Sequence, residues 1–115
     1  MHDTDDNNEL VFKCDFCKMP WADTRPMVEG HRGSLICGQC LSIAYTELIH
    51  LDSGYAPAKG EACVLCLETD RKDLHWQSPI DDASIACKRC IKQSAGVLKK
   101  DPDNGWTRPA DPSKA

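Results

Sequence analysis

The chain has 115 residues, a net charge of −4 and an aromatic content of 6%, so it supplies little material for a large hydrophobic core. No stretch is long and apolar enough to cross a membrane, and the acidic start lacks the basic and apolar regions of a secretory signal. We therefore expect a small cytoplasmic protein without membrane contact, in which another kind of cross-link supplements the core.

Eight cysteines form four C-x-x-C pairs, which divide the chain into two similar halves. The two pairs of the first half are separated by 19 residues, and those of the second half by 20. This spacing is typical of zinc sites, because cysteines three positions apart can turn both sulfurs toward one ion. The sequence therefore predicts two Zn²⁺ ions and eight ligands: Cys14, Cys17, Cys37, Cys40, Cys63, Cys66, Cys87 and Cys90.

The pairs can be combined in two ways. Each half is a complete copy of the motif, which favours one ion per half over a cross-braced arrangement that would join the first pair to the third. Disulfides fit the even cysteine count but conflict with a reducing cytoplasm. Redox-active C-x-x-C pairs need a βαβ context that the sequence lacks. Iron accepts the same four thiolates, although rubredoxin knuckles usually have glycine where this chain has Lys18 and Leu67.

The first half begins after an acidic segment, residues 1–9, that we expect to be a disordered tail. Residues 10–51 form the first predicted finger. Strands at 26–28 and 34–36 flank a turn with two glycines, which predicts a hairpin. The apolar positions after the second cysteine pair then recur with helical spacing, and Asp52-Ser53-Gly54 supplies a stop: Leu41, Ala44, Tyr45, Leu48 and Ile49.

The second half repeats this order after a predicted linker at 52–62. In the second finger, residues 63–100, strands at 74–76 and 84–86 predict another hairpin. Ile91, Ala95 and Leu98 then predict a helix, which Gly96 weakens. Residues 101–115 are expected to form a second disordered tail.

The remaining histidines and tryptophans receive simple predictions. Eight thiolates already fill two metal shells, so we expect the histidines to face solvent: His2, His31, His50 and His75. Trp76 is expected to pack in the core of its finger. Trp106, in a proline-containing tail, is either a tail residue without contacts or a contact for a partner.

The first finger resembles a known family. Its motifs, Cys14-Asp15-Phe16-Cys17-Lys18 and Ile36-Cys37-Gly38-Gln39-Cys40-Leu41, are similar to those of the N-terminal zinc-binding domain of the ClpX unfoldase. The resemblance covers residues 10–51, and residues 63–100 match more weakly. It implies a treble clef, in which a zinc knuckle and a β-hairpin precede a helix whose first turn carries the last two ligands. It also implies a domain that dimerises and docks substrates or adaptor proteins.

The repeat suggests how the two fingers are arranged. A domain that pairs as a homodimer can pair with itself when it is duplicated in one chain. We therefore predict a small, metal-stabilised α+β protein of two treble-clef fingers packed as a pseudo-dimer through their helices. The alternatives are that each helix covers only its own hairpin, or that the chain forms a homodimer.

Closed four-thiolate shells leave no metal position for water, whereas catalytic zinc needs one. The sequence also has no G-x-x-x-x-G-K-[ST] phosphate loop and no recognisable catalytic triad, so we expect neither unfoldase activity nor an enzyme. The prediction is a protein-interaction module or adaptor. The alternative is a nucleic-acid-binding zinc finger, because the second helix carries a basic surface: Lys88, Arg89, Lys92, Lys99 and Lys100.

Overall fold

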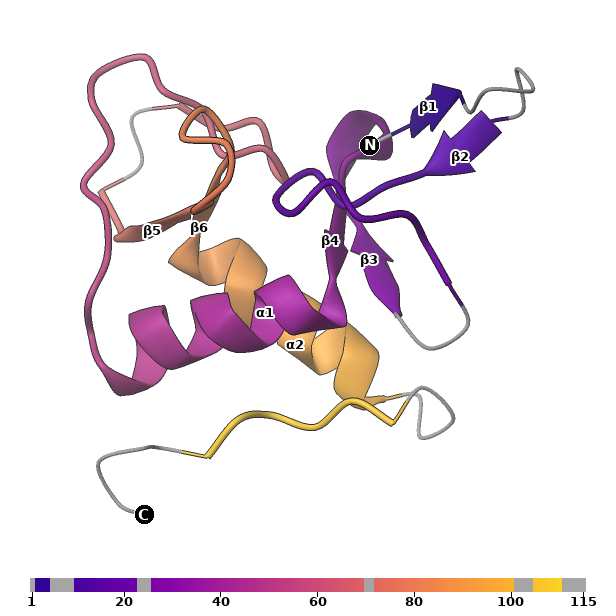
Figure 1. Ribbon diagram of the computed structural model, residues 1–115. Coiled ribbons are helices and arrows are strands. Elements are labelled where there is room, and N and C mark those ends of the chain that lie inside the picture. The colour runs from indigo at the N-terminus through magenta and orange to yellow at the C-terminus, as the bar shows by residue number, and fades with distance from the viewer. Residues whose placement is uncertain (1, 5–9, 23–25, 70–71, 101–104, 111–115) are drawn as a thin grey trace.

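The computed structural model describes residues 2–4, 10–22, 26–69, 72–100 and 105–110. In this part of the chain, three two-stranded antiparallel hairpins accompany two α-helices (Figure 1). The protein is thus a small α+β structure, as predicted. The elements are β1 (His2–Thr4), β2 (Leu10–Phe12), β3 (Met27–Glu29), η1 (His31–Gly33), β4 (Leu35–Cys37), α1 (Gly38–Tyr45), η2 (Thr46–His50), β5 (His75–Gln77), β6 (Ile85–Cys87) and α2 (Lys88–Lys99).

The first finger has the predicted order of knuckle, hairpin and helix. Strands β3 and β4 pair with Met27 opposite Cys37, and η1 forms the turn between them. Helix α1 begins directly after Cys37 and continues into η2, a π-helical turn that the apolar pattern did not predict. Asp52 follows with a φ of 49°, which helps to end the helix at the predicted stop.

The second finger repeats this order. Strands β5 and β6 pair with His75 opposite Cys87, and α2 begins directly after Cys87. The predicted helix is confirmed despite Gly96, because Ile91, Ala95 and Leu98 form its buried face. Burial of this face offsets the modest cost of one glycine in a helix.

The two fingers share one hydrophobic core. Helices α1 and α2 pack against each other (Figure 1). Leu41 of α1 and Leu48 of η2 join the same buried cluster as Ile91 and Leu98 of α2. Each finger alone has too few large side chains for such a core. The predicted packing of the two helical faces is therefore confirmed, and these faces do more than cover their own hairpins.

Reciprocal contacts give the pair an approximate two-fold arrangement. The backbone N–H of His31, in the first hairpin, donates to the carbonyl of Leu65 in the second knuckle at 2.8 Å. On the other side, the Ser78 hydroxyl of the second hairpin donates to the carbonyl of Phe16 in the first knuckle. Pro79 stands in the place of His31 and has no N–H, so the hydroxyl beside it supplies the equivalent hydrogen bond.

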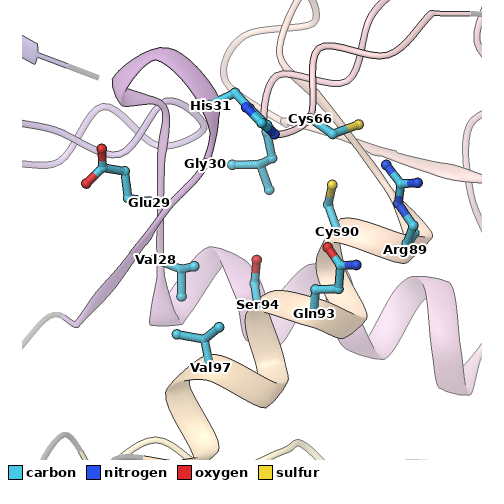
Figure 2. Close-up of a pocket in the computed structure, with 11 residues that line it drawn as sticks. Val28, Glu29, Gly30, His31, Cys66, Arg89, Cys90, Gln93, Ser94 and Val97 are labelled. Carbon is cyan, nitrogen blue, oxygen red and sulfur yellow. The ribbon is translucent and has the colours of Figure 1, made fainter.

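The two-fold arrangement is broken by side-chain size. Phe16 and Trp76 meet across the interface with ring centroids 5.3 Å apart. The equivalent positions on the other side are Leu65 and Val28, which are smaller. A groove of about 420 Å³ lies there, between β3–η1 of the first finger and α2 of the second (Figure 2). The groove therefore follows from the smaller residues on this side of the interface.

The linker is ordered by specific pairing. Tyr55 and His75 exchange two backbone hydrogen bonds, of 2.7 and 2.8 Å, so this part of the linker lies alongside β5. The Tyr55 hydroxyl also donates to Glu61 Oε1 at 2.6 Å. The fingers are consequently joined by a segment that belongs to the second finger's sheet.

Parts of both predicted tails make contacts with the fingers. Residues 2–4 form β1, which pairs with β2, because the apolar and β-prone segment Leu10–Phe12 offers them a strand edge. Trp106 is not a tail residue without contacts: its indole N–H lies 3.1 Å from the Gly38 carbonyl and 2.9 Å from Ser42 Oγ. The rest of the predicted tails, residues 1, 5–9, 101–104 and 111–115, lie outside the described residues.

Candidate metal centres

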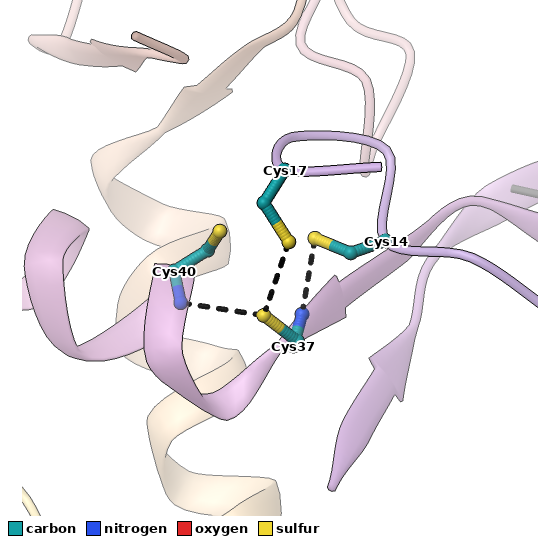
Figure 3. A group of neighbouring side chains, drawn as sticks. All are labelled: Cys14, Cys17, Cys37 and Cys40. Atoms are coloured by element: carbon teal, nitrogen blue, oxygen red, sulfur yellow. Dashed lines mark hydrogen bonds between the residues drawn. The ribbon is translucent and has the colours of Figure 1, made fainter. Parts of the chain in front are cut away.

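The first group of four cysteines comes from three elements of the first finger (Figure 3). Cys14 and Cys17 lie in the knuckle after β2, Cys37 ends β4, and Cys40 lies in the first turn of α1. Their sulfurs all lie within 4.8 Å of one another, and the sulfurs of Cys17 and Cys37 are 3.7 Å apart. The hairpin and the helix thus bring residues far apart in the sequence to one point.

The backbone around this group favours the deprotonated, negatively charged form of the cysteine sulfurs. The backbone N–H groups of Phe16 and Cys37 both donate to Cys14 Sγ at 3.4 Å, and that of Cys40 donates to Cys37 Sγ at the same distance. Lys18 adopts a φ of 65°, which lets its N–H donate to the Cys14 carbonyl and closes the knuckle. These donors stabilise thiolates, the form that binds metal.

The second group has the same construction. Cys63 and Cys66 lie in a knuckle that Leu67 closes with a φ of 63°, while Cys87 ends β6 and Cys90 lies in the first turn of α2. The four sulfurs again lie within 4.8 Å of one another, with Cys66 and Cys87 sulfurs 3.8 Å apart. The second finger therefore has its own group of four cysteines that could hold a metal ion.

The thiols within each group strongly affect one another. Hydrogen bonds from the thiols of Cys87 and Cys90 lower the pKa of Cys63 to about 3. The same interaction raises the pKa of Cys90, because its proton is held by the Cys63 sulfur. In the first group, Cys14 has a lowered pKa and Cys37 a raised one, of about 11, for the same reason. Four thiolates this close repel one another, so a divalent cation is needed to keep all four deprotonated.

The sulfur geometry fits a tetrahedral ion. With metal–sulfur bonds of about 2.3 Å, neighbouring sulfurs of a tetrahedron lie ~3.8 Å apart. The Cys17–Cys37 and Cys66–Cys87 sulfur separations, 3.7 and 3.8 Å, match this edge. All eight predicted residues therefore come together in two groups of four that follow chain order, and each group could hold one metal ion.

A carboxylate fixes the first knuckle against its hairpin. Asp15 Oδ2 accepts a hydrogen bond of 2.7 Å from the backbone N–H of Leu35, and the Asp15 N–H donates to the Leu35 carbonyl at 2.9 Å. In the second finger, the N–H of Val64 makes the equivalent bond to the carbonyl of Ile85 at 2.8 Å. These bonds orient the first ligand pair of each group toward the second.

One histidine differs from its prediction. His75 is only 1% exposed, and its Nδ1 lies 2.8 Å from the Asp73 carbonyl, while its Nε2 has no hydrogen-bond partner in the described structure. Its position in the hairpin corresponds to that of Met27, so His75 occupies a site that suits an apolar residue. Because histidine is polar, the sequence did not predict that this position is buried. His31 is exposed as predicted, His50 is half-buried with its Nε2 2.7 Å from the Pro109 carbonyl, and the side chain of His2 is not described.

No histidine among the described residues joins either cysteine group. Comparisons of the chain with protein-family models, with curated proteins and with solved structures find no match. The similarity to the ClpX zinc domain therefore rests on the motif residues and on the order of knuckle, hairpin and helix. No described helix meets the length and apolarity needed to cross a membrane.

Proposed function

We propose that this protein is a protein-interaction module or adaptor, without catalytic activity, whose fold depends on two structural Zn²⁺ ions. Each ion would be held by one cysteine group, Cys14 to Cys40 or Cys63 to Cys90, and would supply a cross-link between a knuckle and a helix. Four thiolates complete the coordination of zinc, so the metal has no position for a substrate. The free thiols that zinc needs also fit a cytoplasmic location.

The observation that carries this proposal is an apolar surface on the first finger. Phe12, Met19 and Trp21 lie on or beside the first knuckle and are 44%, 45% and 53% exposed. Large apolar side chains that gather on a surface favour contact with another protein. The ClpX resemblance, which implies docking of substrates or adaptors, points in the same direction.

The alternative of nucleic-acid binding receives less support. Within the basic surface of α2, Arg89 forms an ion pair with Glu68 at 2.6 Å and Lys88 lies 3.8 Å from Asp52. These acids offset part of the positive charge that phosphate groups would need. Retention on DNA cellulose at low salt, lost at moderate salt, would favour this alternative.

The metal part of the proposal is tested by native mass spectrometry of the full chain. We expect the mass of two zinc ions, and we expect a strong chelator to remove both and unfold the protein, as followed by circular dichroism. The interaction part is tested by cross-linking the zinc-loaded protein in cell extract, with the chelated protein as control. Specific adducts that need zinc support the proposal, whereas fewer than two metals or an absence of zinc-dependent adducts contradicts it.

A further inference from the structure

The outer edge of β3 is open in the described structure. The Gly30 N–H donates to the Ser34 carbonyl and the Gly38 N–H to the Pro26 carbonyl, so residues 26, 28 and 30 turn their backbone groups toward β4. In an antiparallel pair, successive residues of a strand point their backbone N–H and C=O groups alternately toward the partner strand and away from it. The N–H and C=O groups of Met27 and Glu29 therefore point away from β4, and no described strand pairs with them.

The second finger shows what binds at the same edge. His75 is the equivalent of Met27, since each lies opposite the third cysteine of its finger. Its outward N–H and C=O exchange hydrogen bonds with Tyr55, which runs antiparallel to β5. Two backbone hydrogen bonds and one aromatic side chain thus complete this edge from within the chain.

In the first finger, no described residue pairs with this edge of the hairpin. The residues that precede the first knuckle pair as β1 with β2, in a register that places His2 opposite Phe12. The edge of β3 is left beside a cavity of about 390 Å³. Five residues line this cavity, which we call the β3 slot: Phe12, Trp21, Met27, Glu29 and Leu35.

The lining of the β3 slot indicates what it would accept. Phe12 occupies the position that corresponds to Glu61 in the second finger, and Glu61 accepts the hydrogen bond from the Tyr55 hydroxyl. An aromatic ring in the slot would therefore meet Phe12 and the 53% exposed Trp21 in place of a carboxylate. Glu29 is exposed on the same side of β3 as Met27 and carries the only charge among the lining residues.

We propose that the β3 slot binds an extended segment of a protein partner by strand addition, antiparallel to β3. The segment has an aromatic residue opposite Met27 and a lysine or arginine two positions earlier, opposite Glu29. The register follows from the Tyr55–His75 pair, the aromatic preference from the slot lining, and the basic residue from charge complementarity. This inference rests on the proposed function and names the class of segment that the module recognises.

A peptide based on the chain's own linker tests the proposal. The probe is the fluorescein-labelled octapeptide Leu-Asp-Lys-Gly-Tyr-Ala-Pro-Ala, which is the linker sequence from residue 51 to 58 with lysine in place of serine at its third position. Binding to the zinc-loaded full chain is followed by fluorescence anisotropy. We expect saturable binding that weakens about tenfold when tyrosine becomes alanine or when its backbone nitrogen is methylated, because each change removes one predicted contact.

Protein variants separate backbone pairing from simple apolar contact. Met27→Pro removes an N–H that faces away from β4, so the hairpin retains its hydrogen bonds, while Met27→Ala removes the side chain alone. We expect Met27→Pro to bind the probe about tenfold more weakly than Met27→Ala. Zinc content and circular dichroism establish that both variants are folded.

A charge exchange gives a second test that does not depend on Met27→Pro. Glu29→Lys should weaken binding of the lysine probe and strengthen binding of a probe with glutamate at that position. Absence of binding up to about 1 mM probe, or equal binding by wild type and Glu29→Lys for both probes, would overturn the proposal. A concentration-dependent dimer that Glu29→Lys abolishes would also overturn it, in favour of a second copy as the occupant.

Failure of this inference is distinguishable from failure of the proposed function. If zinc-dependent adducts form equally with wild type, Trp21→Ala and Glu29→Lys, then the protein binds partners through another surface. The β3 slot would then be excluded as the docking site, while the interaction module would stand.

Discussion

Leu67 and Lys18, the residues that close the two knuckles, adopt left-handed backbone conformations that favour glycine. Leu67 is 41% exposed, so its side chain contributes little burial. We expect Leu67→Gly to raise the free energy of unfolding of the zinc-loaded protein by about 1 kcal/mol relative to Leu67→Ala, which loses the same side chain but keeps the strain. Denaturant titration measures the difference, and equal stability of the two variants would contradict this account.

Gly30 and Gly96 allow the same substitution to be compared at two sites. A Cβ at Gly30 would lie 2.6 Å from the carbonyl oxygen and 2.9 Å from the Cα of Leu65, across the interface between the fingers. Nothing lies within 4 Å of a Cβ at Gly96, inside α2. We expect Gly30→Ala to destabilise the protein by about 1–3 kcal/mol through overpacking, and Gly96→Ala to stabilise it by about 1 kcal/mol through helix propensity.

Both glycine variants can be measured by denaturant unfolding of the zinc-loaded protein. The opposite signs are the essential result, because the chemical change is identical at the two positions. A small effect of Gly30→Ala would show that the first hairpin and the second knuckle approach each other less closely than the structure indicates.

At the scale of the element, the segment 105–110 is attached to α1 through hydrogen bonds from Trp106. The Trp106 indole donates to Gly38 and Ser42, and Gly38 lies between the candidate ligands Cys37 and Cys40. We expect Trp106→Phe, which keeps an aromatic ring but removes the donor, to lower the free energy of unfolding by about 1 kcal/mol. Trp21→Phe is the matched control, because Trp21 is exposed and its indole has no described hydrogen bond, and it should leave the stability unchanged in a thermal melt.

The sequence predicted those elements whose signals are local. Turn glycines located the first hairpin, the repeat and a loop with Pro79 located the second, and helical spacing located both helices. The cysteine spacing located both cysteine groups. The features it missed depend on contacts between distant residues: the burial of His75, the pairing of Tyr55 with β5, and the docking of Trp106. The sequence immediately around each of these three residues resembles that of a solvent-exposed position. Their contacts could not be predicted from it, because their partners lie far along the chain.

The positive φ at Lys18 and Leu67 was missed for a different reason. Glycine is the usual signal for this conformation, and neither position has it. The resemblance to a treble clef predicted the knuckle itself. The reciprocal contacts of His31 and Ser78 could not be predicted, because they depend on how the two fingers pack against each other.

At the scale of the whole molecule, the shared core should couple the two metal sites. Phe16 and Trp76 belong to different fingers but to one buried cluster, and each lies next to or near a ligand pair of its own finger. Binding of one ion orders its finger and thereby completes the surface on which the other finger packs. Two independent fingers on a string would show no such effect.

This coupling predicts cooperative zinc binding. When the metal-free protein receives less than two equivalents of zinc, we expect native mass spectrometry to show mainly species with no ion or two ions, and few with one. The double variant Gly30→Ala/Ser78→Ala, which disturbs both reciprocal contacts and no cysteine, should increase the one-ion species. A statistical distribution of ions in the wild-type protein, unchanged in this variant, would show that the fingers fold separately and that the interface follows metal binding without assisting it.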